Sequence, residues 1–546
     1  MFRFSCTAFF FLLPLLLLAS ESSGQQEQPF DILFRGGTLI DGTGKPRTVG
    51  DVGVRDDRIV FIGKAGDAAA DTEIDASGLI VAPGFIDPHN HSLSFRLDEI
   101  EGPILNKAYL LQGVTTIVEG PDGYFSSKRI QAIHDMASEK GIGTNYAFYV
   151  GHNGTRREVM GTAQRAPTEE ELAAMKTLVR EGMEMGAVGF SAGLMYEPGM
   201  FSETAEVIAL AREVKPYGGI YDAHARDPVL KLIESQSETI EIGRAASIPA
   251  KLGHLKTVGL INKGKIDDII SLINGARAEG IDAVSDQYPY DGAATAILER
   301  LIILPGSGQE AGQDNLRDIL TEAGQDPRRM MEIRQASEEG IDGGFSWIKA
   351  VGYGSLRIVN APDQPELVGR NIQLLADEKE LDPFELVVSL ILGNEKSILA
   401  TLGAIEESEV RKLLVQPWNM VCSDGAFADI ASPNGHPRST GSFPRVLGHY
   451  SRDLGLLTLE EAVRKMTSLT ADTLRLYDRG RLEVGKAADI TVFDADRIID
   501  KSTWTDPGAF SEGVVYVLVN GEFAVKDEQV TGETPGQWIK RQSPSR

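Results

Sequence analysis

Histidine is rare in this chain, and four of its histidines fall in short motifs that suit metal binding. The 546 residues include only 8 histidines. His89 and His91 belong to DPHNH, which follows an apolar run, and His224 (YDAHARD) and His254 (LGHLK) end two later runs about one βα unit apart. Side chains alternate along a strand, so His89 and His91 face the same side. Imidazoles grouped in this way are typical zinc ligands.

These motifs sit in a repeated alternation of short apolar runs and helix-like segments, which is the pattern of βα units. Eight strand candidates follow one another: LIVAPGFID, GVTTIVEG, TNYAFYVGH, AVGFSAG, GIYDAHA, IPAKLGHL, DAVSDQYPY and NMVCSDG. Eight such strands predict an α/β fold, a TIM-like (β/α)8 barrel with its active site at the carboxyl ends of the strands. The four histidines would then meet at one mouth. Taken singly, each histidine is equally well explained as a buried core residue.

Asp424, in the SDG that ends the eighth run, would bring a carboxylate to the same mouth, although Asp-Gly is also a common turn. Zinc held by imidazoles and carboxylates lowers the pKa of water to about 7 and polarises a carbonyl group. A carboxylate at hydrogen-bond distance can take the proton from that water and pass it to a leaving nitrogen. The motifs therefore predict metal-assisted amide hydrolysis.

The two ends of the chain differ from the middle in their pattern of apolar and turn residues. Residues 29–82 and 477–546 read as short strands with Gly and Asp-Gly turns, which predicts a small β domain built from both ends. Residues 83–476 would form the barrel. The interval 291–394 is longer than one crossover helix requires, and we expect an inserted helical lid there. The alternative is a second small domain without contact to the site.

Residues 1–24 read as a secretory signal peptide, with Arg3 ahead of the apolar run Ala8–Leu18. That run is shorter than the roughly 20 residues of a spanning helix, so we expect no stable membrane anchor. After cleavage the chain would keep one cysteine, Cys422, and no intramolecular disulfide. These features predict a secreted or periplasmic bacterial protein. The formal charge of −25 excludes nucleic acid as a natural partner.

The motifs together resemble the amidohydrolase superfamily in its D-aminoacylase (N-acyl-D-amino-acid deacylase) branch. The resemblance covers residues 31–538 and is carried by GFIDPHNH, GVTT, VGHNGTRREVMG, GAVGFSAGLMYEPG, YDAHARD, LGHLK, DQYPYDGAATAI, SDG and HPRSTGSFPRVLG. It implies a barrel with a small β-sandwich formed by both chain ends. It also implies roles for single residues: a metal pair (His89, His91), ligands of a tightly bound zinc (His224, His254), the catalytic carboxylate (Asp424), and residues that grip the substrate carboxylate (Lys256, Arg438, and Tyr288 or Tyr290).

His152 and Tyr196 lie in two of these motifs and are expected to line the site, with barrel packing as the alternative for His152 and the tyrosines. One departure concerns the second strand, where the family places a cysteine ligand. Here Asp122 stands in that place, and Glu119 lies three residues earlier. Of the two we favour Asp122. An oxygen ligand makes a harder site that admits Mn²⁺ or Co²⁺ as well as Zn²⁺, and one or two ions are possible.

The expected reaction is hydrolysis of an N-acyl-D-amino acid, or of the last bond in a small peptide that ends in a D-residue, to a carboxylate and a D-amino acid. A cyclic-amide hydrolase of the hydantoinase or dihydroorotase type is the alternative, disfavoured because the fourth strand lacks a lysine that could bridge two metals. A catalytically inactive binding relative is a third possibility. The preferred side chain and acyl group and the oligomeric state have no readable signal in the sequence.

Overall fold

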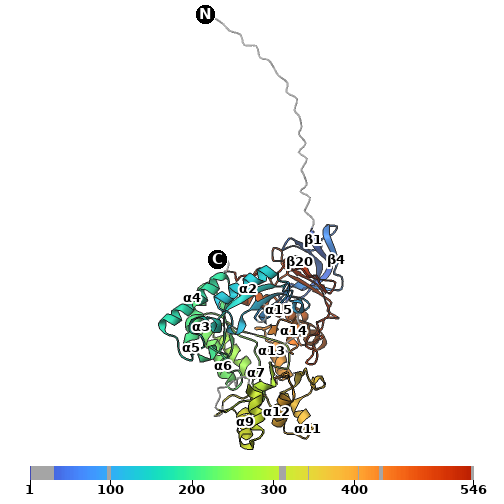
Figure 1. Cartoon of the computed structure of the whole chain (residues 1–546). Helices are drawn as coiled ribbons and strands as arrows, with labels where there is room; N and C mark the ends of the chain where they lie inside the picture. The colour runs from blue at the N-terminus through green and yellow to red at the C-terminus, as the bar shows by residue number, and fades with distance from the viewer. Residues whose placement is uncertain are drawn as a thin grey trace.

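The computed structural model describes Met1 and residues 30–94, 100–305, 315–341, 344–403, 405–428 and 435–542. Apart from Met1, the expected signal peptide lies outside the described residues. Within the described ranges, no helix is both long and apolar enough to cross a membrane. Figure 1 shows the whole chain, with strands from both chain ends gathered in one region.

A parallel sheet of nine strands forms the centre of the molecule, in the order β16-β12-β11-β10-β9-β8-β7-β6-β17. Its strands are β6 (Phe85–His91), β7 (Val114–Glu119), β8 (Asn145–Gly151), β9 (Gly189–Gly193), β10 (Ile220–His224), β11 (Ala250–Leu252), β12 (Ala283–Gln287), β16 (Asn419–Val421) and β17 (Gly425–Ala426). β16 pairs with β12, and β17 pairs with β6. Only residues 422–424 separate β16 from β17, so one segment joins both edges and closes the barrel. The predicted TIM-like α/β fold is confirmed.

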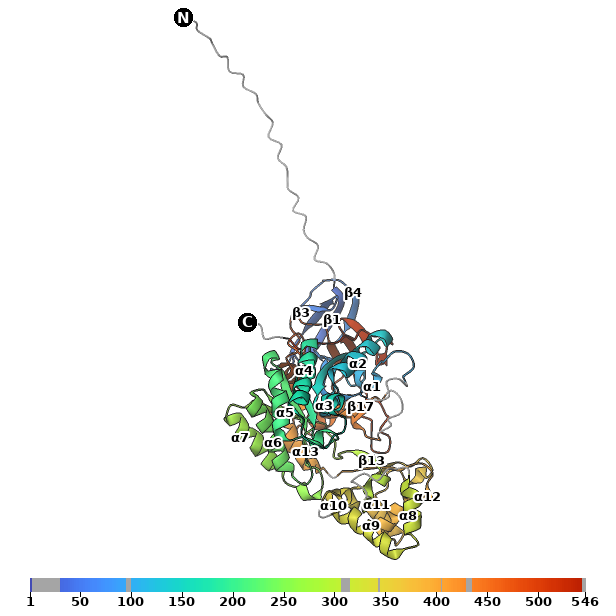
Figure 2. The ribbon, with the colours of Figure 1, turned by 60° about the vertical axis from the view of Figure 1, so that its left-hand side comes forward.

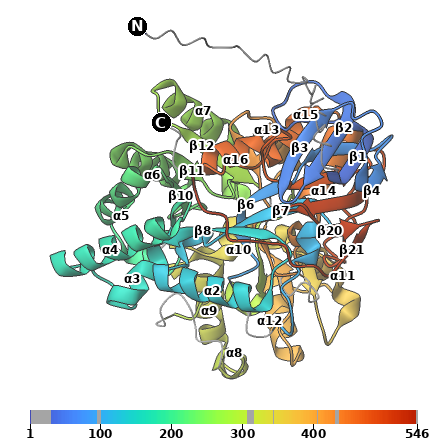
Figure 3. The same ribbon diagram turned by 90° about the horizontal axis from the view of Figure 1, so that it is seen from above.

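Helices pack around this barrel, as the view from above shows (Figure 3). They include α2 (Ser127–Lys140), α3 (His152–Met160), α4 (Glu169–Met185), α5 (Thr204–Ala211), α6 (Leu232–Ala246), α7 (Ile266–Ala278), α13 (Glu407–Leu414), α14 (Arg438–Arg445) and α15 (Leu459–Met466). α4 shows how the sequence specifies them. Thr168 and Glu171 form a capping box at its start. Three of its buried residues, Met175, Val179 and Met183, recur every four positions and face the barrel.

A second sheet combines both chain ends in the order β21-β20-β19-β18-β5-β1-β2-β3, with β4 paired to β1. Its strands are β1 (Phe30–Leu39), β2 (Thr48–Arg55), β3 (Arg58–Gly63), β4 (Ala70–Asp75), β5 (Ile80–Pro83), β18 (Ile490–Phe493), β19 (Val514–Val519), β20 (Glu522–Lys526) and β21 (Gln529–Val530). β1 pairs with β4 along its first half and with β5 along its end. The sheet thereby turns over an apolar core that includes Phe34, Val52 and Ile490.

The final described residues leave this sheet and run along the amino-terminal end of the barrel. Pro535 forms a bridge with Ile142, and Trp538 forms a bridge with Tyr146 at the start of β8. The Trp538 ring lies against Phe148, with centroids 5.5 Å apart. This C-terminal strap therefore covers the end of the barrel opposite the strand ends that carry the histidines.

The insertion between β12 and β16 contains strands as well as the expected helices. It contains α8 (Leu316–Ala323), α9 (Pro327–Glu339), α10 (Trp347–Val351), α11 (Ile372–Glu378) and α12 (Pro383–Gly393), which form a separate group beside the barrel (Figure 2). It also contains a three-stranded antiparallel sheet of β13 (Thr295–Ile297), β15 (Leu399–Thr401) and β14 (Ile358–Asn360). The sheet extends the insertion past residue 394, because β15 returns to pair with β13.

Candidate metal centre

The end of β6 is held in place by a buried carboxylate, that of Asp87. It accepts hydrogen bonds from the backbone amide of Ser423 (3.0 Å), the hydroxyl of Ser423 (2.5 Å) and the side-chain amide of Asn90 (2.8 Å). Burial raises the pKa of Asp87 to about 6, although these hydrogen bonds oppose the shift. Asp87 therefore ties β6 to the closing segment and fixes the direction of the strand just before His89 and His91.

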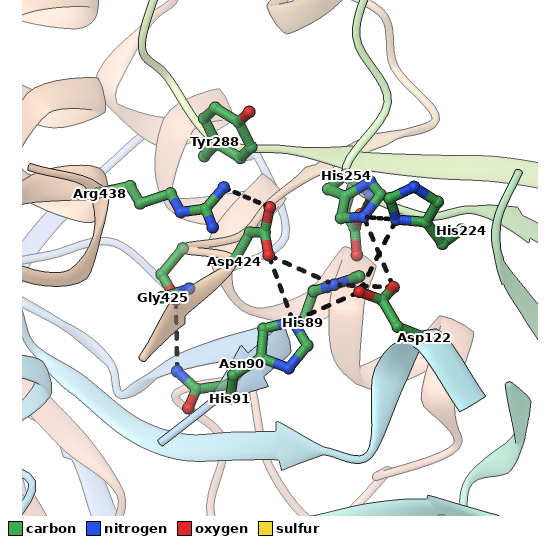
Figure 4. A network of polar contacts seen from close by, with 12 residues as sticks. His89, Asn90, His91, Asp122, His224, His254, Tyr288, Asp424, Gly425 and Arg438 are labelled. Carbon is green, nitrogen blue, oxygen red and sulfur yellow. Dashed lines mark hydrogen bonds and ion pairs between the residues drawn. The ribbon is translucent and has the colours of Figure 1, made fainter. Parts of the chain in front are cut away.

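The four histidines converge on Asp122 at the mouth of the barrel (Figure 4). One oxygen of Asp122 lies 3.6 Å from His89 Nε2 and 3.5 Å from His254 Nε2, and the other lies 3.7 Å from His91 Nε2 and 3.8 Å from His224 Nδ1. Asp122 itself has φ 58°, a left-handed conformation that Asp tolerates better than most residues. This turn lifts its carboxylate off the end of β7 and into the cluster.

Two overlapping groups of side chains have the separations that a metal ion requires. His89, Asp122 and His254 form one, and His89, His91 and Asp424 form the other, with all ligand atoms of each group within 4.8 Å of one another. Several side-chain atoms of the histidines and Asp122 are buried without a hydrogen-bond partner, namely His89 Nε2, His89 Nδ1, His91 Nδ1, His224 Nε2 and Asp122 Oδ1. Buried polar atoms rarely stay unpaired in folded proteins. The donor set and its unpaired atoms therefore fit one or two divalent cations.

Asp424 lies between the histidines and a guanidinium group. Its Oδ1 is 3.3 Å from His91 Nε2 and 3.7 Å from His89 Nε2, and its Oδ2 accepts a hydrogen bond of 2.5 Å from Arg438. Burial alone would raise the pKa of Asp424, but Arg438 and the histidines, His254 foremost, hold that pKa well below its usual range. The carboxylate is thus ionised at neutral pH and available to accept a proton.

A cavity of about 200 Å³ opens above this cluster. It is lined by His91, Asp122, Tyr124, Tyr196, His224, His254, Lys256, Ala293, Ala294, Asp424, Ala426 and Arg438. Lys256 and Arg438 both lie over the ring of Tyr288, at 5.1 and 4.9 Å from its centroid. Burial lowers the pKa of Lys256 to about 8. Two cations beside an ionised carboxylate form a positive subsite that suits a second carboxylate, supplied by a ligand.

Tyr196 also faces the cluster, because its hydroxyl lies 3.2 Å from His224 Nδ1. Asn153 fixes the loop that carries it: its side chain bonds the backbone of Gly193 in both directions and the carbonyl oxygen of Tyr196. The Tyr196 ring stacks on Tyr124, with centroids 6.1 Å apart. Tyr124 follows the Asp122 turn directly, yet its type carried no signal in the sequence.

Three of the predicted site residues point elsewhere. The carboxylate of Glu119 is buried against the loop after β6, where it accepts hydrogen bonds from Ser92 Oγ, the Leu93 amide and Ser94 Oγ. His152 Nε2 lies 2.9 Å from Glu206, which also pairs with Arg156, in a network behind the mouth. The hydroxyl of Tyr290 bonds Asp500, outside the barrel. None of these groups lines the cavity, and of the two carboxylates predicted on the second strand, that of Asp122 lies among the histidines.

Comparison with known proteins gives consistent matches. Residues 386–525 match the model of the Amidohydrolase family. The chain is 34% identical to D-aminoacylase of Alcaligenes xylosoxydans xylosoxydans, over 95% of this chain and 99% of that protein. Its structure is similar to that of N-acyl-D-glutamate deacylase from Bordetella bronchiseptica, in complex with zinc and a phosphonate inhibitor that mimics the tetrahedral intermediate (30% identity, 94% of this chain and 100% of that one, TM-score 0.74).

A solved D-aminoacylase with a binuclear metal centre matches equally well, at 30% identity, 94% and 100% coverage and a TM-score of 0.73. A D-hydantoinase from a Bacillus species shares only the fold, with 17% identity and a TM-score of 0.56 over 94% of this chain and all of that one. The cyclic-amide reading is therefore supported only by a more distant likeness.

Proposed function

Because the chain belongs to the D-aminoacylase family of amidohydrolases, we propose that it hydrolyses N-acyl-D-amino acids to a carboxylate and a free D-amino acid. One observation carries the proposal. Asp424 lies between a cluster of metal-ligand atoms and the two cations Lys256 and Arg438. A substrate whose amide lies at the cluster and whose carboxylate lies at the cations would span Asp424, which is the group that must move the proton.

His89, His91, Asp122, His224 and His254 are the residues that would hold the metal, and Asp424 is close enough to contribute an oxygen. When bound, zinc supplies hydroxide at neutral pH and polarises the amide carbonyl group. The open cavity leaves room for a water and a substrate oxygen beside these ligands. Since an aspartate replaces the family's cysteine, Mn²⁺ and Co²⁺ are also compatible with the site.

The proton transfers fall to Asp424. It is ionised in the resting site, so it can accept a proton from the attacking water. In its protonated form it can then donate that proton to the leaving nitrogen, which must become an amine to depart. Arg438 holds Oδ2 of Asp424, which leaves Oδ1 directed at the cluster. The arginine thereby orients the same carboxylate whose charge it stabilises.

Three fixed contacts would make the site selective between the two enantiomers of a substrate. The scissile carbonyl lies at the cluster, the α-carboxylate lies at Lys256 and Arg438, and the side chain takes the remaining space beside Tyr124 and Tyr196. With the first two contacts fixed, the two enantiomers direct their side chains to opposite sides of the α-carbon. A small peptide ending in a D-residue presents the same three groups and is a second substrate class for this site.

The decisive measurement is a screen of N-acetyl-D- and N-acetyl-L-amino acids with the purified protein and added Zn²⁺, Mn²⁺ or Co²⁺. We expect turnover of D-substrates alone, and removal of the metal with a chelator should abolish it. Equal turnover of the L-series, or hydantoin opening at a higher rate than amide hydrolysis, would contradict the assignment.

The protein is further proposed to act outside the bacterial cytoplasm, as a secreted or periplasmic enzyme that acts on small molecules. The apolar segment of the first 24 residues and the single remaining cysteine of the expected mature chain support this. The mass of the protein's amino-terminal peptide after expression in a bacterium, and its cell fraction, test the proposal. An uncleaved protein confined to the cytoplasm would rule it out.

A further inference from the structure

Beneath the histidine cluster, the barrel interior contains a charged group that the proposed reaction does not use. Lys251 on β11, Asp222 on β10 and Asp286 on β12 are all fully buried. The ammonium of Lys251 lies 3.0 Å from Asp222 Oδ1 and donates a hydrogen bond to Asp286 Oδ2. These three residues are called the interior triad below.

A lysine and two aspartates are an unusual filling for a barrel, where branched apolar side chains dominate. Burying a charge costs free energy, and apolar residues of similar volume are often as stable or more stable in such places. The two carboxylates keep the lysine charged: although burial opposes it, they hold the pKa of Lys251 well above its usual value. Fold stability alone therefore gives little reason for the interior triad.

Its contacts reach all three strand ends that carry histidines. Lys251 Nζ donates a hydrogen bond of 3.3 Å to the carbonyl oxygen of Pro88, the residue before His89. Asp222 is the direct neighbour of Lys251 in the β10–β11 register. It precedes His224 by two positions, so both side chains face the barrel interior. Asp286 accepts a hydrogen bond of 2.5 Å from the backbone amide of His254 through its other oxygen.

The contact with His254 is made where the backbone is strained. His254 has φ 34°, a left-handed conformation that a non-glycine residue adopts only when its surroundings hold it there. The side chain of Asp286 holds the amide of His254, and the backbone oxygen of Asp286 accepts the amide of Leu255 at 2.8 Å. Lys251 in turn holds the carboxylate of Asp286, because it donates a hydrogen bond to Oδ2, whereas the His254 amide bonds Oδ1.

We propose that Lys251 is a positioning residue for the metal centre. Through Pro88, Asp222 and Asp286 it holds His89, His224 and His254 in one common geometry before a metal binds. The inference rests on the proposed function to the extent that these histidines bind metal. Groups that orient metal ligands from behind typically contribute about 10- to 100-fold to metal affinity.

The test compares Co²⁺ binding to metal-free wild type, K251M and K465M, read from the d–d absorption bands during titration. Lys465 is a matched control, because it is also fully buried but bonds backbone carbonyls of Gln416 and Asn419 at the other end of the barrel. We expect K251M to weaken Co²⁺ binding about 10- to 100-fold and to shift the bands. We expect kcat to fall more than KM changes, and K465M to bind Co²⁺ as wild type does.

A folded K251M with wild-type affinity and bands would overturn the inference. If K251M does not fold, D286N replaces it, because an asparagine keeps an oxygen for the His254 amide but loses the charge that fixes Lys251. Wild-type binding by D286N would overturn the inference equally. Hydrolysis of N-acetyl-D-amino acids by the wild type is measured separately. A wild type that binds Co²⁺ but hydrolyses none of them would refute the proposed function and leave the positioning role to be decided by the titrations.

Discussion

At the scale of single residues, Asp424 is the group on which we expect turnover to depend. D424N keeps the shape of the side chain but cannot accept a proton at neutral pH. We expect kcat to fall about 100- to 10,000-fold, the usual contribution of a general acid–base group. Metal held by His89, Asp122 and His254 should remain, as elemental analysis would show, because D424N changes none of these three ligands. A D424N enzyme with more than a tenth of wild-type activity would show that another residue moves the proton.

Lys256 and Arg438 are expected to act on binding of the substrate carboxylate. K256M removes a charged donor, and a hydrogen bond to a charged group contributes about 1.5–3 kcal/mol, so KM should rise at least tenfold. The control is a substrate amide, which lacks the α-carboxylate. For that compound, wild type and K256M should differ little. An equal loss with both substrates would indicate that Lys256 acts through its hydrogen bond to the carbonyl of His254 instead.

Asp122 should determine which metals the site accepts. D122A removes the carboxylate that lies within 3.8 Å of all four histidines and should lower metal affinity at least tenfold, as chelator competition would show. D122C supplies a soft thiolate in its place. Because thiolates favour zinc over harder ions, we expect D122C to lose Mn²⁺-supported activity relative to Zn²⁺-supported activity. An unchanged ratio would place Asp122 outside the metal's ligands.

Residue types and strand alternation predicted most residues of this cluster. The predictions that failed did so for physical reasons. His89 and His91 both lie on β6, so their common direction could be predicted from their spacing of two residues. Asp122 sits after β7 in a left-handed turn, where alternation no longer applies, which is why Glu119 remained a candidate. Nothing local revealed that His152 pairs with Glu206, 54 positions away. Lys251 lies within the strand candidate IPAKLGHL, but nothing in the neighbouring sequence indicates that it pairs with Asp222 and Asp286.

At the scale of elements, the eight strand candidates correspond to the barrel strands, whereas the strands of the insertion were not predicted from the sequence. β13, β14 and β15 have three residues each, too short for any period to show. Their pairing depends on partners up to about a hundred positions apart. The helical segments between them carry N-cap residues such as Asp326 and Asp382, which explains why only the helices were predicted.

The link between α15 and β16 gives a prediction about pH and stability. Burial lowers the pKa of Lys465 to about 7, with Glu461 opposing the shift, whereas an unfolded lysine has a pKa of about 10.4. Between these values the unfolded chain binds more protons, so this lysine makes the free energy of unfolding rise with pH. We therefore expect the free energy of unfolding of wild type minus that of K465M to increase from pH 7 to pH 9, by up to about 1.4 kcal/mol per pH unit.

Denaturant unfolding of both proteins at pH 7, 8 and 9 measures this difference, and comparison with the variant removes the contribution of every other titrating group. Below pH 7 the difference should be flat, since the lysine is then protonated in both states. A difference that is constant or shrinks above pH 7 would contradict the assignment.

At the scale of the whole molecule, the C-terminal strap joins the end of the chain to the base of the barrel. The Trp538 ring is partly buried against His134 and Phe148, with centroid distances of 4.6 and 5.5 Å. We expect W538A to lower the free energy of unfolding by about 1–3 kcal/mol, in line with the loss of a large apolar contact. Because the strap lies at the end of the barrel opposite the site, kcat/KM at 25 °C should not change. The exposed neighbour Gln537, as Q537A, serves as the control, and a W538A enzyme with impaired turnover would show coupling between the two ends.

The segment that closes the barrel has a consequence for how the enzyme acquires activity. Asp424 lies between β16 and β17, and its backbone amide bonds the carbonyl of His89 across the seam. Positions 89 and 424 are 335 residues apart in the sequence, and contacts so distant in sequence form slowly. A refolding chain could collect metal on its first six strands before the seam forms. Hydrolysis would then be the last property to return during refolding. The time course of recovered turnover would therefore report when the fold is complete.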